Sequence, residues 1–240
     1  MPFPVPCSLF PVLFPVPCSL FPVLYLAWYG HPVIPPPPDR LRGVLFDLDG
    51  VLIDSARAWY NVIRRGVERL GRAAPSYEEF QRTFGQGVEA DRREFFPEWS
   101  AARVQELYER TFAEEIDAVQ LLPGALEVLE TLRARGLRQA GVTNTPLALA
   151  RLVLARKGIA PHLDAIATSG EGAEKPAPDL LLLALRRLQL QGDEALYVGD
   201  TVVDRQAARA AGVAMAGIGV AADLQLAGVR DLLSYCGSAR

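Results

Sequence analysis

Four short segments of this sequence carry acids, a hydroxyl and a lysine, the groups that proteins use for proton transfer, nucleophilic attack and ion binding. Each segment follows an apolar run that is typical of a buried strand. The segments are Asp47-Leu48-Asp49-Gly50, Thr143-Asn144-Thr145, Glu174-Lys175-Pro176 and Gly199-Asp200-Thr201-Val202-Val203-Asp204. In open parallel sheets, ligands bind outside the carboxyl ends of the strands. We therefore expect the four segments to meet at one rim and to form an active site.

The elements that must position these groups alternate between strands and helices. Apolar runs predict strands near residues 41–46, 139–142, 164–167, 195–198 and 213–216, the last of these being the final main strand. Segments with helical spacing lie between them, for example residues 147–157 and 178–190. This alternation favours a parallel sheet that is covered on both faces. The predicted fold class is α/β, a Rossmann-like doubly wound parallel sheet.

A long helical region interrupts the alternation after the first strand. Apolar residues recur at helical spacing in residues 59–70 and 104–116, on either side of a stretch broken by glycine and proline. We predict an inserted all-helical cap at residues 55–121, on an α/β core formed by residues 39–54 and 122–240.

Together, the four segments resemble the motifs of the haloacid dehalogenase superfamily of phosphohydrolases. The motifs are present as FDLDGVLIDS, GVTNT, EKPAPD and GDTVVD. Their order and spacing also match, and the resemblance covers nearly all of residues 41–220. Each motif is weak by itself, whereas four in order after predicted strands are a specific signal. The runs LPGALEVLETLRARG and AARAAGV are similar to the phosphoglycolate phosphatase-like group, which has a helical cap.

The resemblance implies a phosphatase in which Asp47 is the nucleophile and forms an aspartyl-phosphate. Asp49 would protonate the leaving alkoxide and then activate the water that hydrolyses the intermediate. The implied cofactor is Mg²⁺, which prefers a few carboxylates with waters and substrate phosphate. Asp47, Asp200 and Asp204 would hold it, together with the carbonyl oxygen of Asp49.

The same resemblance assigns the phosphoryl oxygens of the substrate to Thr143, to the backbone amide of Asn144 after it and to Lys175, with Gly50 as a further substrate-binding residue. Lys175 would pair with both the nucleophile and the phosphate. The chain has only two lysines among its 25 basic residues. A lysine at this position is therefore more informative than usual.

Each site residue also has a structural interpretation. Asp47 and Asp49 could form a turn and a helix cap, and Asp200 could be a turn residue. Asp204 and Thr143 could each cap the helix that follows. A lysine is usually solvated surface. The presence of all four motifs in order favours the functional interpretation.

In the cap, Gly85-Gln86-Gly87 is either a turn that faces the substrate or an ordinary loop. Arg82 and Arg92 could bind a substrate carboxylate, although solvation at the surface is the preferred interpretation. Linkers near residues 54–55 and 121–123 would let the cap open and close. A covered site suits a small phosphorylated metabolite better than a phosphoprotein. The aromatic residues predicted to form the core of the cap are Trp59, Phe95, Phe96 and Trp99.

Asp49 favours phosphoryl transfer over dehalogenation, because a halide leaving group needs no proton. Hexose-phosphate mutases of the superfamily are a closer alternative. They typically carry a histidine shortly after the first motif, whereas this chain has Trp59 there. A catalytically idle interaction module is an alternative from another class, which the retained acids and Lys175 disfavour.

Composition separates residues 1–38 from the rest of the 240-residue chain. They hold 12 of the 19 prolines and no charged residue, and FPVPCSLFPVL at 3–13 recurs at 14–24. Since proline breaks a membrane-spanning helix, we expect a disordered tail without a membrane span. It is either a targeting or proline-ligand segment, or a duplication or early-start extension without a selected role.

The remaining expectations concern location and partners. A net charge of −3 disfavours a basic nucleic-acid binder. Cys7, Cys18 and Cys236 are too few and too peripheral for a disulfide framework, which predicts a cytoplasmic protein. We expect a monomer or homodimer whose partner is its substrate.

Overall fold

The computed structural model describes residues 35–37 and 39–237, so the tail predicted at residues 1–38 lies almost wholly outside the described residues. Pro36 is buried, and its carbonyl accepts a 2.6 Å hydrogen bond from the hydroxyl of Tyr235. The folded unit therefore includes residues before position 39, where composition alone put its start.

One sheet of six parallel strands forms the centre of this unit, in the order β5-β4-β1-β6-β7-β8. The strands are β1 (Gly43–Phe46), β4 (Arg138–Pro146), β5 (Ala165–Ser169), β6 (Ala195–Gly199), β7 (Ala214–Ile218) and β8 (Leu224–Leu226). In β1, Gly43 lies opposite both Arg138 and Ala195, so β1 is flanked on both sides. All of its residues are buried, as expected for a continuous apolar run in a parallel sheet.

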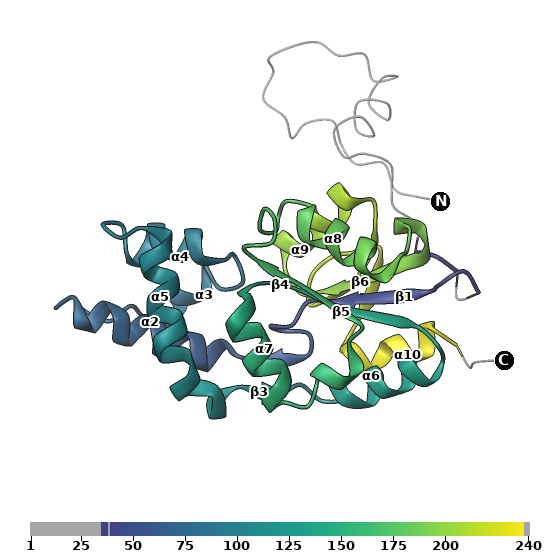
Figure 1. Ribbon diagram of the computed structural model, residues 1–240, viewed down its shortest axis with the longest axis horizontal. Coiled ribbons are helices and arrows are strands. Elements are labelled where there is room, and N and C mark those ends of the chain that lie inside the picture. The colour runs from purple at the N-terminus through teal and green to yellow at the C-terminus, as the bar shows by residue number, and fades with distance from the viewer. Residues whose placement is uncertain (1–34, 38, 238–240) are drawn as a thin grey trace, which may run out of the picture. The chain divides into compact units, whose positions relative to one another are not determined.

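Helices cover both faces of the sheet (Figure 1). Val44 and Phe46 belong to the core on one face, and Leu45 belongs to the core on the other, because successive strand residues alternate in direction. The first face is covered by α6 (Ala125–Ala134), α7 (Leu147–Arg156) and α10 (Leu232–Tyr235), and the second by α8 (Asp179–Leu188) and α9 (Val202–Ala211). Short 3₁₀ turns are η3 (Ala160–His162), η4 (Gly192–Glu194) and η5 (Val229–Asp231). The predicted doubly wound α/β class is confirmed.

Two strands differ from the sequence prediction. β4 continues to Pro146 instead of ending at residue 142, with a register shift against β5 between Thr143 and Pro146. Its polar end has a loop-like composition, although its backbone remains extended. β8 is an additional strand beyond the predicted last one, and it has only three residues, too few for a periodic signal.

The inserted region contains helices α2 (Ala56–Arg69), α3 (Tyr77–Gln81), α4 (Val88–Phe95) and α5 (Ala101–Thr111) and the 3₁₀ helix η2 (Phe112–Ala118). The stretch broken by glycine and proline thus holds two helices, α3 and α4, which are short. Strand β2 (Ile53–Asp54) pairs antiparallel with β3 (Gln120–Leu121), so the chain leaves the core and returns to it at the same place.

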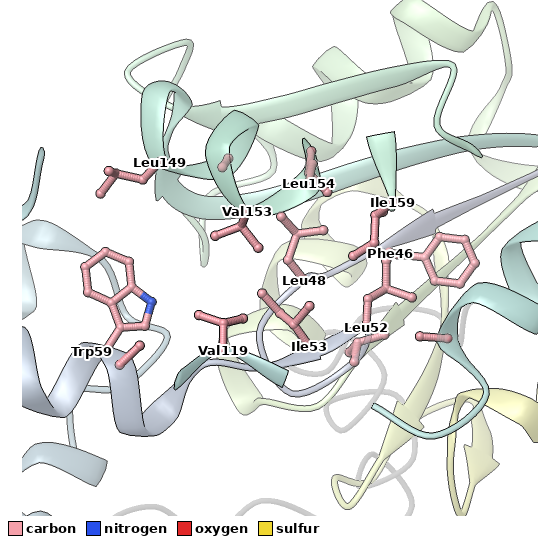
Figure 2. Close-up of a cluster of buried hydrophobic side chains, with 14 of the residues drawn as sticks. Phe46, Leu48, Leu52, Ile53, Trp59, Val119, Leu149, Val153, Leu154 and Ile159 are labelled. Carbon is pink, nitrogen blue, oxygen red and sulfur yellow. The ribbon is translucent and has the colours of Figure 1, made fainter. Parts of the chain in front are cut away.

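Buried side chains connect the sheet with the base of the helical insertion. Figure 2 shows Phe46 of β1 in one cluster with Ile53, Val119 and, at the far end, Trp59 of α2. Within the insertion, Phe95 and Phe96 are also buried, as predicted. In the part of the chain that the structure describes, no helix combines the length and the apolarity needed to cross a membrane.

Candidate active site

The ammonium group of Lys175 brings three of the four motifs together. Its Nζ lies 2.9 Å from Asp47 Oδ1 and 2.7 Å from Asp204 Oδ1, and it donates a 3.1 Å hydrogen bond to the hydroxyl of Tyr197. Lys175 is 3% exposed, so its interpretation as solvated surface is wrong. Buried charged groups that perturb one another's pKa values in this way are typical of functional sites.

Asp47 stands directly after β1, at the carboxyl end of the flanked strand. Its Oδ1 accepts hydrogen bonds from the backbone amide of Leu48 at 2.8 Å and is also the oxygen next to Lys175. Among the described residues, no group donates to Oδ2 of Asp47. One carboxylate oxygen is thus fixed in place, and the other is left for a ligand.

Asp49 is held by groups from two directions. The hydroxyl of Ser55, at the start of the insertion, donates to Oδ1, and Thr145 of β4 donates to Oδ2 at 3.3 Å. Burial raises the pKa of Asp49, while hydrogen bonds from Ser55, Thr145 and Trp59 oppose this shift. A carboxyl group that is both oriented and raised in pKa can carry a proton at a higher pH than usual.

β4 contributes two buried polar residues with different surroundings. Thr143 is 2% exposed, and its oxygen accepts from the amide of Thr145 at 3.0 Å, which leaves its hydroxyl hydrogen for another acceptor. Asn144 donates from Nδ2 to the Lys175 carbonyl at 3.0 Å and accepts from the Lys175 amide at 2.8 Å. It also donates to the Gly85 carbonyl of the helical insertion at 3.3 Å. The side chain of Asn144 therefore fixes the backbone of Lys175. The substrate contact predicted for the backbone amide of Asn144 stays a prediction.

Asp204 has both carboxylate oxygens occupied by protein groups. Oδ1 accepts from Lys175 and, at 2.5 Å, from the hydroxyl of Tyr197. Oδ2 accepts from the amide and the hydroxyl of Thr201, which is the N-cap of α9. Asp204 is thus both the counter-ion of the lysine and part of a capping box, so the capping alternative considered from sequence also holds.

The acids at this rim suit a divalent cation. Ligand atoms of Asp47, Asp200 and Asp204 all lie within 4.8 Å of one another. Asp200 Oδ1 is buried and has no hydrogen-bond partner among the described residues. With Asp49 nearby, four carboxyl groups face a single lysine, and burial of such an excess requires a further positive charge. The unpartnered oxygen and this charge excess together fit the Mg²⁺ that the sequence resemblance implies.

Gly50 has a steric role in this arrangement. Its φ is +81°, and a Cβ atom there would lie 2.0 Å from Oδ2 of Asp200. Its amide donates to the carbonyl of Ile53 at 2.7 Å. Glycine lets Asp200 approach the loop after β1, and its amide is already engaged within that loop, whereas a substrate contact was expected.

The charges in the cluster shift one another's pKa values. Burial favours the neutral amine of Lys175, but Asp204 and Asp47 outweigh it and raise its pKa. Burial raises the pKa of Asp47 well above its ordinary value, and Lys175 offsets this only in part. Burial and the carboxylate of Asp204 raise the pKa of Asp200 to about 7. Lys175 lowers the pKa of Asp204 despite burial, so Asp204 is the ionised partner of the lysine.

A cavity extends from this cluster to the helical insertion. Its base is formed by Asp47, Asp49, Thr143 and Lys175. Gly85 and Gly87 lie on the opposite wall, so the glycine turn faces the site. The other lining residues are Trp59, Phe80, Phe84, Val88, Asp91, Tyr108, Asn144, Thr145 and Pro146.

Several residues around the site were not identified as functional from the sequence. Tyr197 reads as one member of an apolar strand, although a buried tyrosine hydroxyl needs a partner, which was the available signal. Ser55 and Thr145 lie within or beside the motifs but do not belong to the residues for which the resemblance assigns a role. Asp91 looks like part of the solvated face of a helix, and nothing in its spacing distinguishes it.

Comparisons with known proteins agree with this geometry. The profile of the haloacid dehalogenase-like hydrolase family matches residues 41–212. A phosphoglycolate phosphatase from Nitrosospira multiformis is 33% identical over 186 residues, which span 73% of this chain and 82% of that protein. The crystal structure of a HAD-superfamily hydrolase from Geobacter sulfurreducens has a TM-score of 0.68 at 27% identity and covers 80% of this chain and 100% of its own. A β-phosphoglucomutase from Clostridium difficile shares the fold, with a TM-score of 0.72 at 21% identity, over 80% of this chain and 93% of its own.

Proposed function

Because this chain belongs to the haloacid dehalogenase-like hydrolase family, we propose that it hydrolyses a small phosphomonoester through an aspartyl-phosphate on Asp47. The observation that carries the proposal is the buried ion pair between Asp47 and Lys175 at the base of the cavity. The activity for which relatives such as the Nitrosospira multiformis phosphoglycolate phosphatase are named supports the same reaction class.

In the first step, Asp47 Oδ2 attacks phosphorus and the bond from phosphorus to the ester oxygen breaks. Asp49 gives its proton to that oxygen, so the alcohol leaves neutral. In the second step, Asp49 takes a proton from water as the water oxygen attacks phosphorus. Inorganic phosphate then leaves and the Asp47 carboxylate is restored. The raised pKa of Asp49 suits a group that must begin the cycle protonated.

Lys175 and Thr143 act on the phosphoryl group. The ammonium of Lys175 offsets the repulsion between the Asp47 carboxylate and the phosphate dianion, which otherwise opposes the attack. Thr143 has a hydroxyl hydrogen left for a phosphoryl oxygen. Asn144 and Asp204 act indirectly, by fixing the backbone and the ammonium of Lys175.

Mg²⁺ would be held by Asp47 and Asp200, with the Asp49 carbonyl oxygen as a further ligand. When bound, it supplies positive charge that stabilises the transferring phosphoryl group. Asp204 was expected as a third ligand, but both of its oxygens are engaged, so we assign it to positioning Lys175.

The helical insertion would act as the cap, with residues 55–121 moving on the linkers at the β2–β3 pair. A covered cavity supports a small metabolite as substrate. We propose a cytoplasmic setting from the cysteine usage of the sequence, and no nucleic-acid partner from its net charge. A hexose-phosphate mutase is disfavoured, because α2 presents Trp59 to the cavity and indole cannot relay a proton at neutral pH. We still expect the protein to be a monomer or a homodimer.

The test is Mg²⁺-dependent hydrolysis of p-nitrophenyl phosphate by the purified chain. We expect Asp47→Asn to lower kcat by about 10³-fold or more, since it removes the nucleophile. The matched control Asp193→Asn, an exposed acid paired with Arg40, should keep full activity. Hydrolysis that is absent with every metal, or unchanged in Asp47→Asn, would refute the mechanism, and the former would favour an idle interaction module.

A further inference from the structure

The cavity is lined by a half-buried acid, Asp91, that the reaction does not use. Asp91 is on α4 and lines the cavity beside Trp59, Phe84, Val88 and Tyr108. Because Asp49 protonates the leaving oxygen, the leaving group must extend from Asp49 toward this cap side of the cavity. Asp91 is therefore placed to contact the part of the substrate that distinguishes one phosphate ester from another.

One oxygen of Asp91 is satisfied and the other is not. Tyr108 donates to Oδ2 at 2.7 Å and is itself 1% exposed. Oδ1 is buried, and no described group meets hydrogen-bond geometry with it. The nearby Thr83 hydroxyl donates to the Phe80 carbonyl at 3.3 Å. A buried carboxylate oxygen without a donor is costly, and a ligand that brings a donor removes this cost.

No cation of the cavity wall balances Asp91. The one cation among the described lining residues is Lys175, which is engaged by Asp47 and Asp204. Arg92, once a candidate for binding a substrate carboxylate, is paired with Glu89 at 2.8 Å and does not line the cavity. A substrate carboxylate at this wall would face a like charge in an apolar surrounding, which disfavours binding.

We propose that Asp91 selects the substrate by accepting a hydrogen bond from a hydroxyl or ammonium group of the leaving alcohol. This inference rests on the proposed phosphatase function and narrows it. The substrate class is a small alcohol or amino-alcohol phosphate without a carboxylate at that end, in contrast to the phosphoglycolate named for the relatives. The cavity has about 50 Å³ of space for water, which is room for a few water molecules. This small volume agrees with a short leaving group.

Three esters of nearly equal size test the proposal: 2-hydroxyethyl phosphate, O-phosphoethanolamine and 2-phosphoglycolate. They present a hydroxyl, an ammonium and a carboxylate at the same distance from the phosphate. Their three-carbon homologues test a longer distance between the phosphate and that group. We expect kcat/KM for the better of the hydroxyl and ammonium esters to exceed that for phosphoglycolate by about tenfold or more. The ester with the higher kcat/KM of these two identifies the donor group that the enzyme prefers.

Asp91→Asn removes the charge and keeps an acceptor for Tyr108. We expect it to lower kcat/KM for the ammonium ester by about tenfold and to raise that for phosphoglycolate several-fold. Asp91→Asn should still hydrolyse p-nitrophenyl phosphate, which shows that the variant is folded and active. Asp117→Asn, at an exposed acid of the same insertion, should leave all three values as they are.

The proposal is overturned if phosphoglycolate is hydrolysed as well as the donor esters or better, or if Asp91→Asn leaves their ratio unchanged. It is also overturned if p-nitrophenyl phosphate is hydrolysed and none of the esters is, while the phosphatase function then stands. If p-nitrophenyl phosphate is not hydrolysed either, the proposed function itself fails.

Discussion

Lys175 is the residue on which the charge of the site depends. Its ammonium lies between two acids, and together they form a buried group with one net negative charge. Removing the lysine from this group leaves buried carboxylates unpaired, which costs about 3–5 kcal/mol. With this negative excess, the proposed entry of a phosphate dianion would require a further cation. Binding of metal and substrate should therefore depend on each other.

Asp91 gives a stability prediction at the residue scale. Burial raises the pKa of Asp91 from 3.8 to about 6, and the hydrogen bond from Tyr108 opposes this shift only in part. A carboxyl whose pKa is raised by folding stabilises the fold most when protonated, below about pH 4, and this stabilisation is lost as pH rises through 6. The amide that replaces the carboxyl group in Asp91→Asn cannot ionise. We expect it to exceed the wild type in free energy of unfolding by up to about 3 kcal/mol at pH 8 and by about half as much at pH 5.

Urea denaturation of the full chain at the two pH values measures this difference, with Asp117→Asn as the variant that should show none. A gain that is equal at both pH values would mean that packing, not ionisation, separates Asp91→Asn from the wild type. A residue that lowers stability at neutral pH while lining a substrate cavity is in keeping with a functional role.

At the scale of elements, β4 and the loop before α8 are joined through Asn144. Two of its hydrogen bonds pair the amide and the carbonyl of Lys175, and a third reaches Gly85 in the loop between α3 and α4. One side chain thus connects the strand, the lysine and the helical insertion. The side chain of Asn144 reaches these groups because the end of β4 keeps an extended backbone.

We expect Asn144→Ala to lower kcat for p-nitrophenyl phosphate by about tenfold or more and stability by about 1–3 kcal/mol, because it leaves buried backbone groups of Lys175 unpaired. Asn61→Ala is the matched control, since it removes a side-chain hydrogen bond to Glu115 within the insertion. It should reduce stability with kcat nearly unchanged. Equal kcat in the wild type and Asn144→Ala would show that Lys175 holds its position without this contact.

The elements differ in how far the sequence predicted them. β1 and β6 have continuous apolar runs that only a buried strand explains, so they were predicted correctly. The end of β4, the short β8 and the helices α3 and α4 were not, because the end of β4 is polar and the other three are too short for a periodic signal. The motif segments were found from their places after predicted strands, and the roles of their residues came from the resemblance to a family. Asp91 was missed because its partner Tyr108 is 17 positions away, and only the fold brings them together.

At the scale of the whole molecule, the site draws on two regions with different tasks. The groups proposed for chemistry follow strands of the sheet, which is rigid because both of its faces are packed. The groups proposed for selection come from α4 and α5 of the insertion, which joins the core at one pair of short strands. Substrate preference can thus change through the insertion while the phosphate site stays as it is.

The start of the folded unit gives a prediction for the whole chain. The carbonyl of Pro37 accepts from the amides of Arg40 and Leu41 at 2.8 and 3.1 Å, and that of Pro36 from Tyr235 at 2.6 Å. A chain that begins at residue 35 keeps these contacts, and one that begins at 39 loses them. We expect the former to match the full chain in kcat/KM. The latter should lose about 1–2 kcal/mol of stability, or a few degrees in Tm.

Thermal denaturation and hydrolysis of p-nitrophenyl phosphate, measured on the full chain and both truncations, check this. Every described residue of the cavity lies after position 46, so kcat should stay the same in all three proteins wherever they are folded. A large loss of turnover in the chain that begins at residue 35 would show that residues 1–34 contribute to the site. Equal Tm values for the two truncations would mean that the contacts of Pro36 and Pro37 do not stabilise the fold.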